Sequence, residues 1–196
     1  MTTLERGFKS WTERLSIDVR RNMGLKPEDR VDPLRLAEFL EMKVCTPKSL
    51  GLPERILDQL LNKDPWGWSA VSLQLPSDGG LIIYNPKNSK QRQASDITHE
   101  LAHFILNHQP ATIILSSNGD LAMRTFDKKQ EDEANWLAFC LLLPRAALLS
   151  SKYGGLTSEE IADRYQVSKV LVNFRLNVSG VQAQFRARKK SKKRRS

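Results

Sequence analysis

The spacing of apolar residues predicts two helices and a strand in the first part of the chain. A helical repeat covers residues 4–24 and consists of Leu4, Phe8, Trp11, Leu15 and Val19. A second helix is expected over residues 34–40, because Asp32 can cap it and Pro33 suits its first turn. Residues 42–46 are then typical of a short strand, and residues 54–61 of one or two helical turns.

A β-hairpin is predicted in the next part of the chain. Residues 66–73 and 81–85 have the composition of strands, and Pro76-Ser77-Asp78-Gly79-Gly80 between them favours a turn. The edge of such a hairpin can bind an extended peptide through main-chain hydrogen bonds. Which strand forms that edge is left open, and Trp66 and Trp68 are expected to pack in the core or at its rim rather than in a cleft.

Two apolar helices follow the hairpin. The first runs through residues 97–106 and is expected to end before Pro110, and the second runs from the acidic residues 131–133 to Leu143, where Pro144 stops it.

The last part of the chain has a helix-turn-helix pattern. Thr157 and Glu160 form a capping box at the start of one helix, and Ser168 caps a second helix after a short turn. The second helix offers only Lys169, Asn173 and Arg175 as polar side chains that could read bases. Phosphate affinity is common, whereas base specificity needs several aimed side chains, so operator reading is not favoured.

The net charge of +9 is concentrated at the C-terminus. Eight basic residues and no acidic ones lie within residues 186–195, which leaves a formal charge of +1 on the rest of the chain. Runs of this kind are usually disordered, and they attract nucleic acid without reading its sequence. We therefore expect a basic, disordered tail over residues 181–196 that makes nonspecific contact with nucleic acid.

Cysteine content and hydropathy predict a cytoplasmic protein. The chain has two cysteines, and Cys140 lies in an apolar helix, which indicates a buried thiol and no disulfide framework. The apolar run Leu137–Leu143 is too short to span a membrane, and the first residues lack the apolar core of a signal peptide. No membrane partner is expected.

The strongest chemical signal is the sequence His99-Glu100-Leu101-Ala102-His103, an H-E-x-x-H motif. Residues four apart share one face of a helix, so His99 and His103 can both direct an imidazole nitrogen at one metal ion. Glu100 then lies close enough to accept a proton from a water bound to that metal. All three histidines of the chain fall within ten residues, which favours a metal site.

A catalytic zinc ion normally takes three protein ligands and leaves one position open, so a third ligand is expected. His108 is the nearest candidate, but it lies about 140° further round the helix than His103, and we interpret it as a helix-end residue. The other candidates are the acidic residues Glu131 to Glu133. Acidic residues at a helix start are also stabilised by the helix dipole whatever the function. The sequence alone therefore leaves two interpretations open, a metal ligand or a charge that only stabilises the helix start.

Three blocks of the chain resemble the ImmA/IrrE family of zinc metallo-endopeptidases. They are the strand-like residues 81–85, the motif region 97–108 and residues 131–144, and the resemblance extends over roughly residues 15–180. It implies that Glu131 is the third ligand, with Glu133 as the alternative, and that Asn135 orients a histidine from outside the ligand set. It also implies a cytoplasmic peptidase that cuts a DNA-binding repressor of a mobile element or a stress response. Family members often carry the C-terminal helix pair for packing or substrate docking.

Taken together, these patterns predict an α+β, zincin-like fold with a small, mostly antiparallel sheet beside the H-E-x-x-H helix. Residues 1–150 are expected to form the metallopeptidase domain and residues 151–180 the helix-turn-helix-like pair. The expected function is a zinc-dependent endopeptidase with His99, His103 and Glu131 as ligands and Glu100 as general base. The alternative is a DNA- or protein-binding regulator with a structural or vestigial zinc site. Tyr84 is a candidate for stabilising the oxyanion, but no spacing argument supports it.

Overall fold

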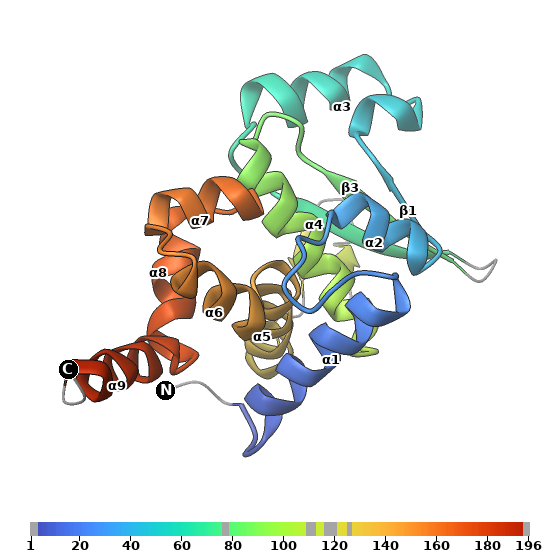
Figure 1. The fold of residues 1–196 in the computed structure, drawn as a ribbon. Coiled ribbons are helices and arrows are strands. Elements are labelled where there is room, and N and C mark those ends of the chain that lie inside the picture. The colour runs from blue at the N-terminus through green and yellow to red at the C-terminus, as the bar shows by residue number, and fades with distance from the viewer. Residues whose placement is uncertain (1–3, 76–78, 109–112, 116–120, 125–126, 194–196) are drawn as a thin grey trace.

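Helices make up most of the fold, and a small sheet lies beside two of them (Figure 1). The computed structural model describes residues 4–75, 79–108, 113–115, 121–124 and 127–193. The first half contains α1 (Phe8–Asn22), α2 (Pro33–Phe39), β1 (Met42–Cys45), a 3-10 turn η1 (Pro47–Leu50), α3 (Glu54–Asp58), a π-helical turn η2 (Gln59–Lys63), β2 (Ala70–Leu75) and β3 (Gly79–Tyr84). The second half contains α4 (Lys90–Ile105), β4 (Ile113–Leu115), β5 (Leu121–Arg124), α5 (Lys128–Leu142), α6 (Arg145–Tyr153), α7 (Ser158–Tyr165), α8 (Lys169–Val178) and α9 (Val181–Lys193).

The main sheet is mixed, which corrects the expectation of a mostly antiparallel one. Its strand order is β1-β3-β2. β2 and β3 form the predicted antiparallel hairpin, although the turn residues 76–78 lie outside the described part of the chain. β1 pairs with β3 in parallel. A parallel neighbour needs a long crossover, which the chain makes here through α3, η2 and β2.

The larger of two hydrophobic clusters joins this sheet to α4 and α5. Ile82 of β3, Leu101 of α4 and Leu137 of α5 are fully buried within it. Small residues at the contact between α4 and α5, among them Ala102 and Ala134, allow the two helices to approach closely. The sheet and α1 therefore fix α4 and α5 from opposite sides (Figure 1).

The second hydrophobic cluster joins the end of α5 to the C-terminal helices. It contains Leu142, Leu148, Ile161, Val172 and Val181, from α5 through α9. The predicted caps of α7 and α8 are confirmed: Thr157 and Glu160 form a capping box, and Ser168 accepts a hydrogen bond from the Leu171 amide.

Residues 181–193 form helix α9, which corrects the disordered tail that was expected from residue 181. The helix begins at the fully buried Val181, and its aromatic residue Phe185 lies 6.2 Å from Tyr153 of α6 between ring centroids. The guanidinium carbon of Arg188 lies over the Tyr153 ring, 4.7 Å from its centroid. The apolar and aromatic contacts at its start explain why a basic segment is helical here.

Two arginines are buried beside the end of α5. Arg20 of α1 donates to the carbonyl of Leu141 at 2.6 Å, and Arg175 of α8 donates to the carbonyl of Leu143 at 3.0 Å and forms an ion pair with Glu13. Burial lowers the pKa of the Arg20 guanidinium to about 10, which leaves it charged at neutral pH. Both side chains satisfy carbonyls that the end of a helix leaves without partners.

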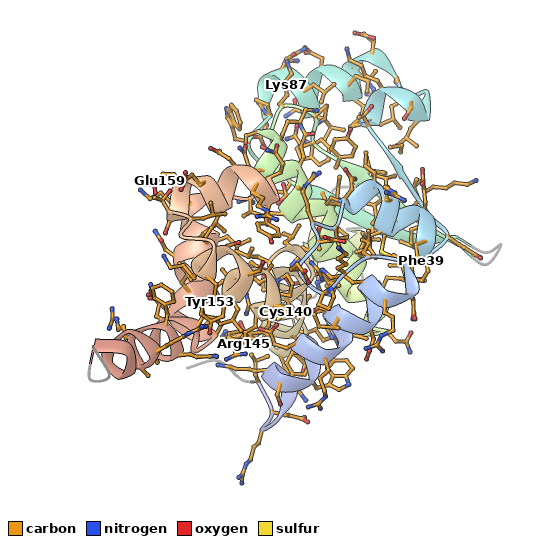
Figure 2. The ribbon with its side chains drawn as sticks, in the orientation of Figure 1. Phe39, Lys87, Cys140, Arg145, Tyr153 and Glu159 are labelled. Carbon is orange, nitrogen blue, oxygen red and sulfur yellow. The ribbon has the colours of Figure 1, made fainter. Side chains whose placement is uncertain are left out.

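The buried environment of α5 also accounts for its apolar composition. Among the described residues, the stretch Lys128–Tyr153 is long and apolar enough to cross a membrane by length and composition alone, but 67% of its apolar window is buried inside the protein. Cys140 of α5 is buried, as predicted, and its Sγ lies 3.6 Å from Thr12 Oγ1 of α1 (Figure 2). Burial raises the pKa of its thiol to about 11, so the thiol stays protonated at neutral pH. Core packing is sufficient to explain this stretch.

The buried pair between α8 and α1 predicts a large loss of stability when its cation is removed. We expect Arg175→Met to lower the free energy of unfolding by about 3 kcal/mol, because Glu13 and the Leu143 carbonyl lose their guanidinium partner. Urea unfolding followed by circular dichroism measures the change. The matched control is Lys169→Ala, also on α8, which removes an exposed ion pair with Glu159 of α7 and should change the stability little. Equal losses in the two variants would contradict the structural role assigned to Arg175.

Candidate metal centre

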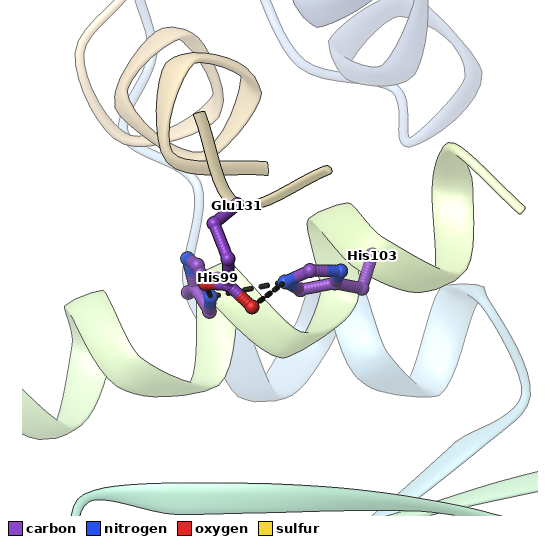
Figure 3. Close-up of side chains that lie close together, drawn as sticks. All are labelled: His99, His103 and Glu131. Carbon is purple, nitrogen blue, oxygen red and sulfur yellow. Dashed lines mark hydrogen bonds and ion pairs between the residues drawn. The ribbon is translucent and has the colours of Figure 1, made fainter. Parts of the chain in front are cut away.

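Two imidazoles of α4 lie one helical turn apart and converge on one point. Ser89 caps α4 by accepting a hydrogen bond from the Arg92 amide, and the helix continues without interruption through His99 and His103. The Nε2 atoms of the two histidines are 3.1 Å apart (Figure 3). Buried residues on the opposite face of the helix, among them Ile97 and Leu101, hold this face toward α5.

Glu131 of α5 completes the cluster. The first turn of α5 is capped by Asp127, whose side chain accepts from the amides of Lys129 and Gln130. Glu131 projects from this turn toward α4, with one carboxylate oxygen 3.2 Å from His99 Nε2 and the other 3.6 Å from His103 Nε2 (Figure 3).

The spacing of these three side chains fits a metal ion. A tetrahedral site with metal–ligand bonds of about 2.1 Å separates its ligand atoms by about 3.4 Å, close to the three separations observed. The side chains are between 16% and 27% exposed, so one side of the cluster stays accessible. His99, His103 and Glu131 can therefore hold an ion and leave a position open.

Glu100 lies beside the cluster and outside it. Its side chain is 4% exposed, and one of its carboxylate oxygens accepts a hydrogen bond of 2.5 Å from the hydroxyl of Ser72 on β2. Ser72 was not among the predicted site residues, since no local pattern connects it to a residue 28 positions later. The hydrogen bond fixes the Glu100 side chain in the direction of β2.

A chain of hydrogen bonds extends behind His103. The Nδ1 atom of His103 lies 3.0 Å from Nδ1 of His108, and Nε2 of His108 lies 3.2 Å from a carboxylate oxygen of Glu133. With the lone pair of His103 Nε2 directed at the metal position, its Nδ1–H donates to His108, which in turn donates to Glu133. Glu133, the alternative third ligand, is therefore placed behind the cluster, where it can orient a ligand through His108.

The position of His108 differs from the expectation that it faces elsewhere, and the reason is the way α4 ends. Asn107 adopts a left-handed conformation with φ of 51°. The amide of His108 donates to the carbonyl of His103, and the amide of Asn107 donates to the carbonyl of Phe104. This is a Schellman motif, which reverses the chain direction and brings His108 back against the last turn of α4, beside His103. The asparagine before His108 was a signal for this motif, since asparagine tolerates the left-handed conformation.

A polar cavity of about 620 Å³ opens in front of the cluster. Trp66 and Trp68, which were expected to pack in the core or at its rim, both line it. Asp96, one turn before His99, lines it as well and forms an ion pair with Arg92 at 2.8 Å. Burial raises the pKa of the Asp96 carboxyl, and the charge of Arg92 acts in the opposite direction. The cavity therefore leaves the metal position accessible from this side.

Two further candidate residues lie in different surroundings. Asn135 lines the cavity one turn after Glu131. Tyr84 lies in the central strand β3 and packs against the larger hydrophobic cluster, away from the cavity lining. His108 lies within hydrogen-bonding distance of His103, so it can orient that histidine from outside the cluster.

Comparison with known protein families gives one match. The family described as Peptidase M78, the IrrE N-terminal-like domain, matches residues 60–177, which include β2, β3 and every residue of the cluster. A search of the curated proteins found no match to the chain.

The geometry predicts different consequences for the two neighbouring glutamates. We expect Glu131→Gln to abolish stable binding of a divalent metal ion, because it removes the charge of the one carboxylate in the cluster. Titration with Co²⁺, followed by its visible absorption in competition with a chelator, measures the affinity.

Glu133→Gln is the matched control for this measurement. It should bind one ion per chain with an affinity reduced by about 10–100-fold, because Glu133 acts through His108 and not on the ion. A weaker site in Glu133→Gln than in Glu131→Gln would reverse the assignment of the third ligand.

Proposed function

The chain belongs to the Peptidase M78 family of the IrrE N-terminal-like domain, and we propose that it is a zinc-dependent endopeptidase. The observation that carries this proposal is the placement of Glu100 next to a His-His-Glu cluster that opens into a cavity. A structural metal site needs neither an adjacent carboxylate nor an accessible side.

Zinc suits the cluster because imidazole nitrogens and a carboxylate oxygen are among its usual ligands. When bound, a zinc ion polarises the scissile carbonyl and lowers the pKa of water. His99 and His103 remain neutral in this role, and the hydrogen bond from His103 to His108 fixes the tautomer that leaves Nε2 free.

Glu100 is the general base and then the general acid. As a carboxylate, it accepts the proton of the attacking water while the water oxygen bonds to the peptide carbonyl carbon. It then delivers that proton to the nitrogen of the leaving amine as the carbon–nitrogen bond breaks. Ser72 holds the carboxylate in position through the hydrogen bond to Oε2, and the second oxygen is the one that exchanges the proton.

β2 provides an edge along which a peptide can bind. Among the strands that the structure describes, β2 pairs only with β3, and residues 69 and 70, just before and at its start, line the metal cavity. An extended peptide can therefore pair with the outer edge of β2 and pass in front of the cluster. Arg92 stabilises this part of the cavity, since its guanidinium donates to the Ser69 hydroxyl at 2.9 Å.

The substrate in this proposal is a DNA-binding transcriptional repressor of a mobile element or a stress response, cleaved in the cytoplasm. Two features support it: the family to which the chain belongs, and the basic segment at the C-terminus. The charge of that segment attracts the peptidase to DNA without reading bases, and so raises its concentration near a DNA-bound substrate.

Two observations favour the peptidase over a DNA-binding regulator. Of the polar residues on α8 that were considered as base readers, Arg175 is 1% exposed and bound to Glu13, and Lys169 is paired with Glu159. A recognition helix needs several side chains aimed at base edges. Asn173 and Asn177 are the remaining exposed polar side chains of α8, which are too few for sequence-specific binding.

Glu100→Gln tests the mechanism. The variant should retain zinc, because Glu100 is not part of the cluster, while peptide cleavage falls by about 10²–10⁴-fold through loss of the proton acceptor. Zinc content by elemental analysis and kcat/KM measured on the same sample check both expectations. Glu54→Gln, at an exposed position on α3, is the control and should change neither quantity. Full activity of zinc-loaded Glu100→Gln would exclude this mechanism.

Removal of the basic segment tests the proposed contact with DNA. A chain that ends at residue 185 should cleave free repressor normally, since the cluster lies far upstream. It should lose nonspecific DNA retention at low salt and cleave operator-bound repressor more slowly. Gel-shift and cleavage series across salt concentrations measure the two effects. Equal DNA retention by both chains at every salt concentration would leave the segment with no role in DNA contact.

A further inference from the structure

A second cavity, of about 360 Å³, lies beside the metal cavity and is apolar. It is lined by Gln91 and Ser95 of α4, Phe139 and Leu142 of α5, and residues Val167, Ser168, Val170, Leu171 and Phe174 in and before α8. Ser95 and Phe139 also line the metal cavity, so the two cavities adjoin each other at the contact between α4 and α5.

The wall that α8 contributes is apolar and well supported. Val170 is 79% exposed and Phe174 is 37% exposed, although both are apolar. The Phe174 ring packs edge-on against Phe139 and Trp136, with centroids 5.4 Å and 6.0 Å away. The buried ion pair of Arg175 fixes the same turn of α8 from behind. These contacts keep an apolar surface open where a soluble helix usually presents polar residues.

The distance of this pocket from the metal position follows from helix geometry. Ser95 precedes His99 by one turn, or about 6 Å along the axis, and Phe139 follows Glu131 by about 12 Å. An extended peptide advances about 3.3 Å per residue. A peptide bound across the cluster would therefore present to the pocket a side chain within about four residues of the scissile bond.

We infer that this pocket, which adjoins the metal cavity, is a specificity site that binds one large apolar side chain, such as leucine, methionine or phenylalanine, of the substrate polypeptide. The inference rests on the proposed peptidase function and adds to it the residue class that determines where the substrate is cut. The helix-turn-helix-like pair then has a role in substrate binding, because α8 forms the outer wall of the pocket.

The lining excludes nucleic acid as the occupant. None of the described residues that line the pocket is charged, whereas a site for a phosphate backbone contains lysine or arginine. The position of the pocket next to the metal cavity instead favours the chain that is cleaved there. An apolar pocket of this size discriminates by burial of side-chain area.

A degenerate peptide library tests the inference with the zinc-loaded full chain. Sequencing of the products should show enrichment of large apolar residues at one position within about four residues of the cut. Matched peptides with leucine or alanine at that position should differ in kcat/KM by about 10–200-fold. The variants Val170→Asp and Phe174→Ala should reduce this ratio at least about tenfold, because they add a charge to the wall or remove its aromatic ring.

Asn173→Ala is the matched control, since Asn173 lies on the same helix, is exposed and does not line the pocket. It should keep the wild-type ratio. Val170 is largely exposed, so Val170→Asp should fold normally even if loss of the buried ring destabilises Phe174→Ala. Cleavage without apolar selection, or a ratio unchanged in Val170→Asp, would overturn the inference and leave the peptidase function standing.

A library that remains uncut would count against the proposed function and not decide the role of the pocket. In that case the same library is passed over immobilised zinc-loaded protein, and bound peptides are sequenced. Retention of peptides with a large apolar residue, lost in Val170→Asp and kept in Asn173→Ala, supports the pocket. Retention without apolar preference overturns it.

Discussion

The burial of α5 is the constraint on which the rest of the structure depends. Residues of this helix belong to both hydrophobic clusters, so the helix has almost no solvent-facing side beyond its first turns. Its final carbonyls cannot reach water and need donors from the protein. Arg20 and Arg175 supply them from α1 and α8, elements that are distant in the sequence. Guanidinium groups suit this role because they remain charged when buried and offer several donors in a fixed plane.

The rigidity of α5 is transmitted to the metal centre. Two ligands come from one helix and the third comes from another, so their separation depends on how α4 and α5 pack. Small buried residues bring the helices close, and the sheet supports α4 from its other side. Behind the cluster, Glu133 of α5 also reaches His108 at the end of α4, so the same two helices are joined by a hydrogen-bonded chain outside the ligand set. The packing of α4 against α5 and this hydrogen-bonded chain together hold His103 in one orientation.

The features that the sequence predicts well are those determined by neighbouring residues. The H-E-x-x-H spacing, the cap of α2 at Asp32 and the capping box at Thr157 each act within one helical turn, and the family match agrees with the resemblance seen in the motifs. The parallel pairing of β1, the hydrogen bond from Ser72 and the burial of Arg175 connect distant segments. Arg175 was expected among the polar side chains that could read bases, and only its contacts with Glu13 and the Leu143 carbonyl show that it faces inward. The position of His108 lies between these cases, since Asn107 gave a local signal for the turn.

The meeting of two hydrophobic clusters along one helix separates the candidate metal centre from a surface that can diverge. The helix that carries His99 and His103 packs in one cluster, and the buried face of α8 packs in the other. Substitutions at distant, independently packed positions have nearly additive effects. A lineage can therefore exchange exposed residues of α8 without disturbing the ligand geometry, and a duplicated copy of this protein could follow a changing target by altering one surface.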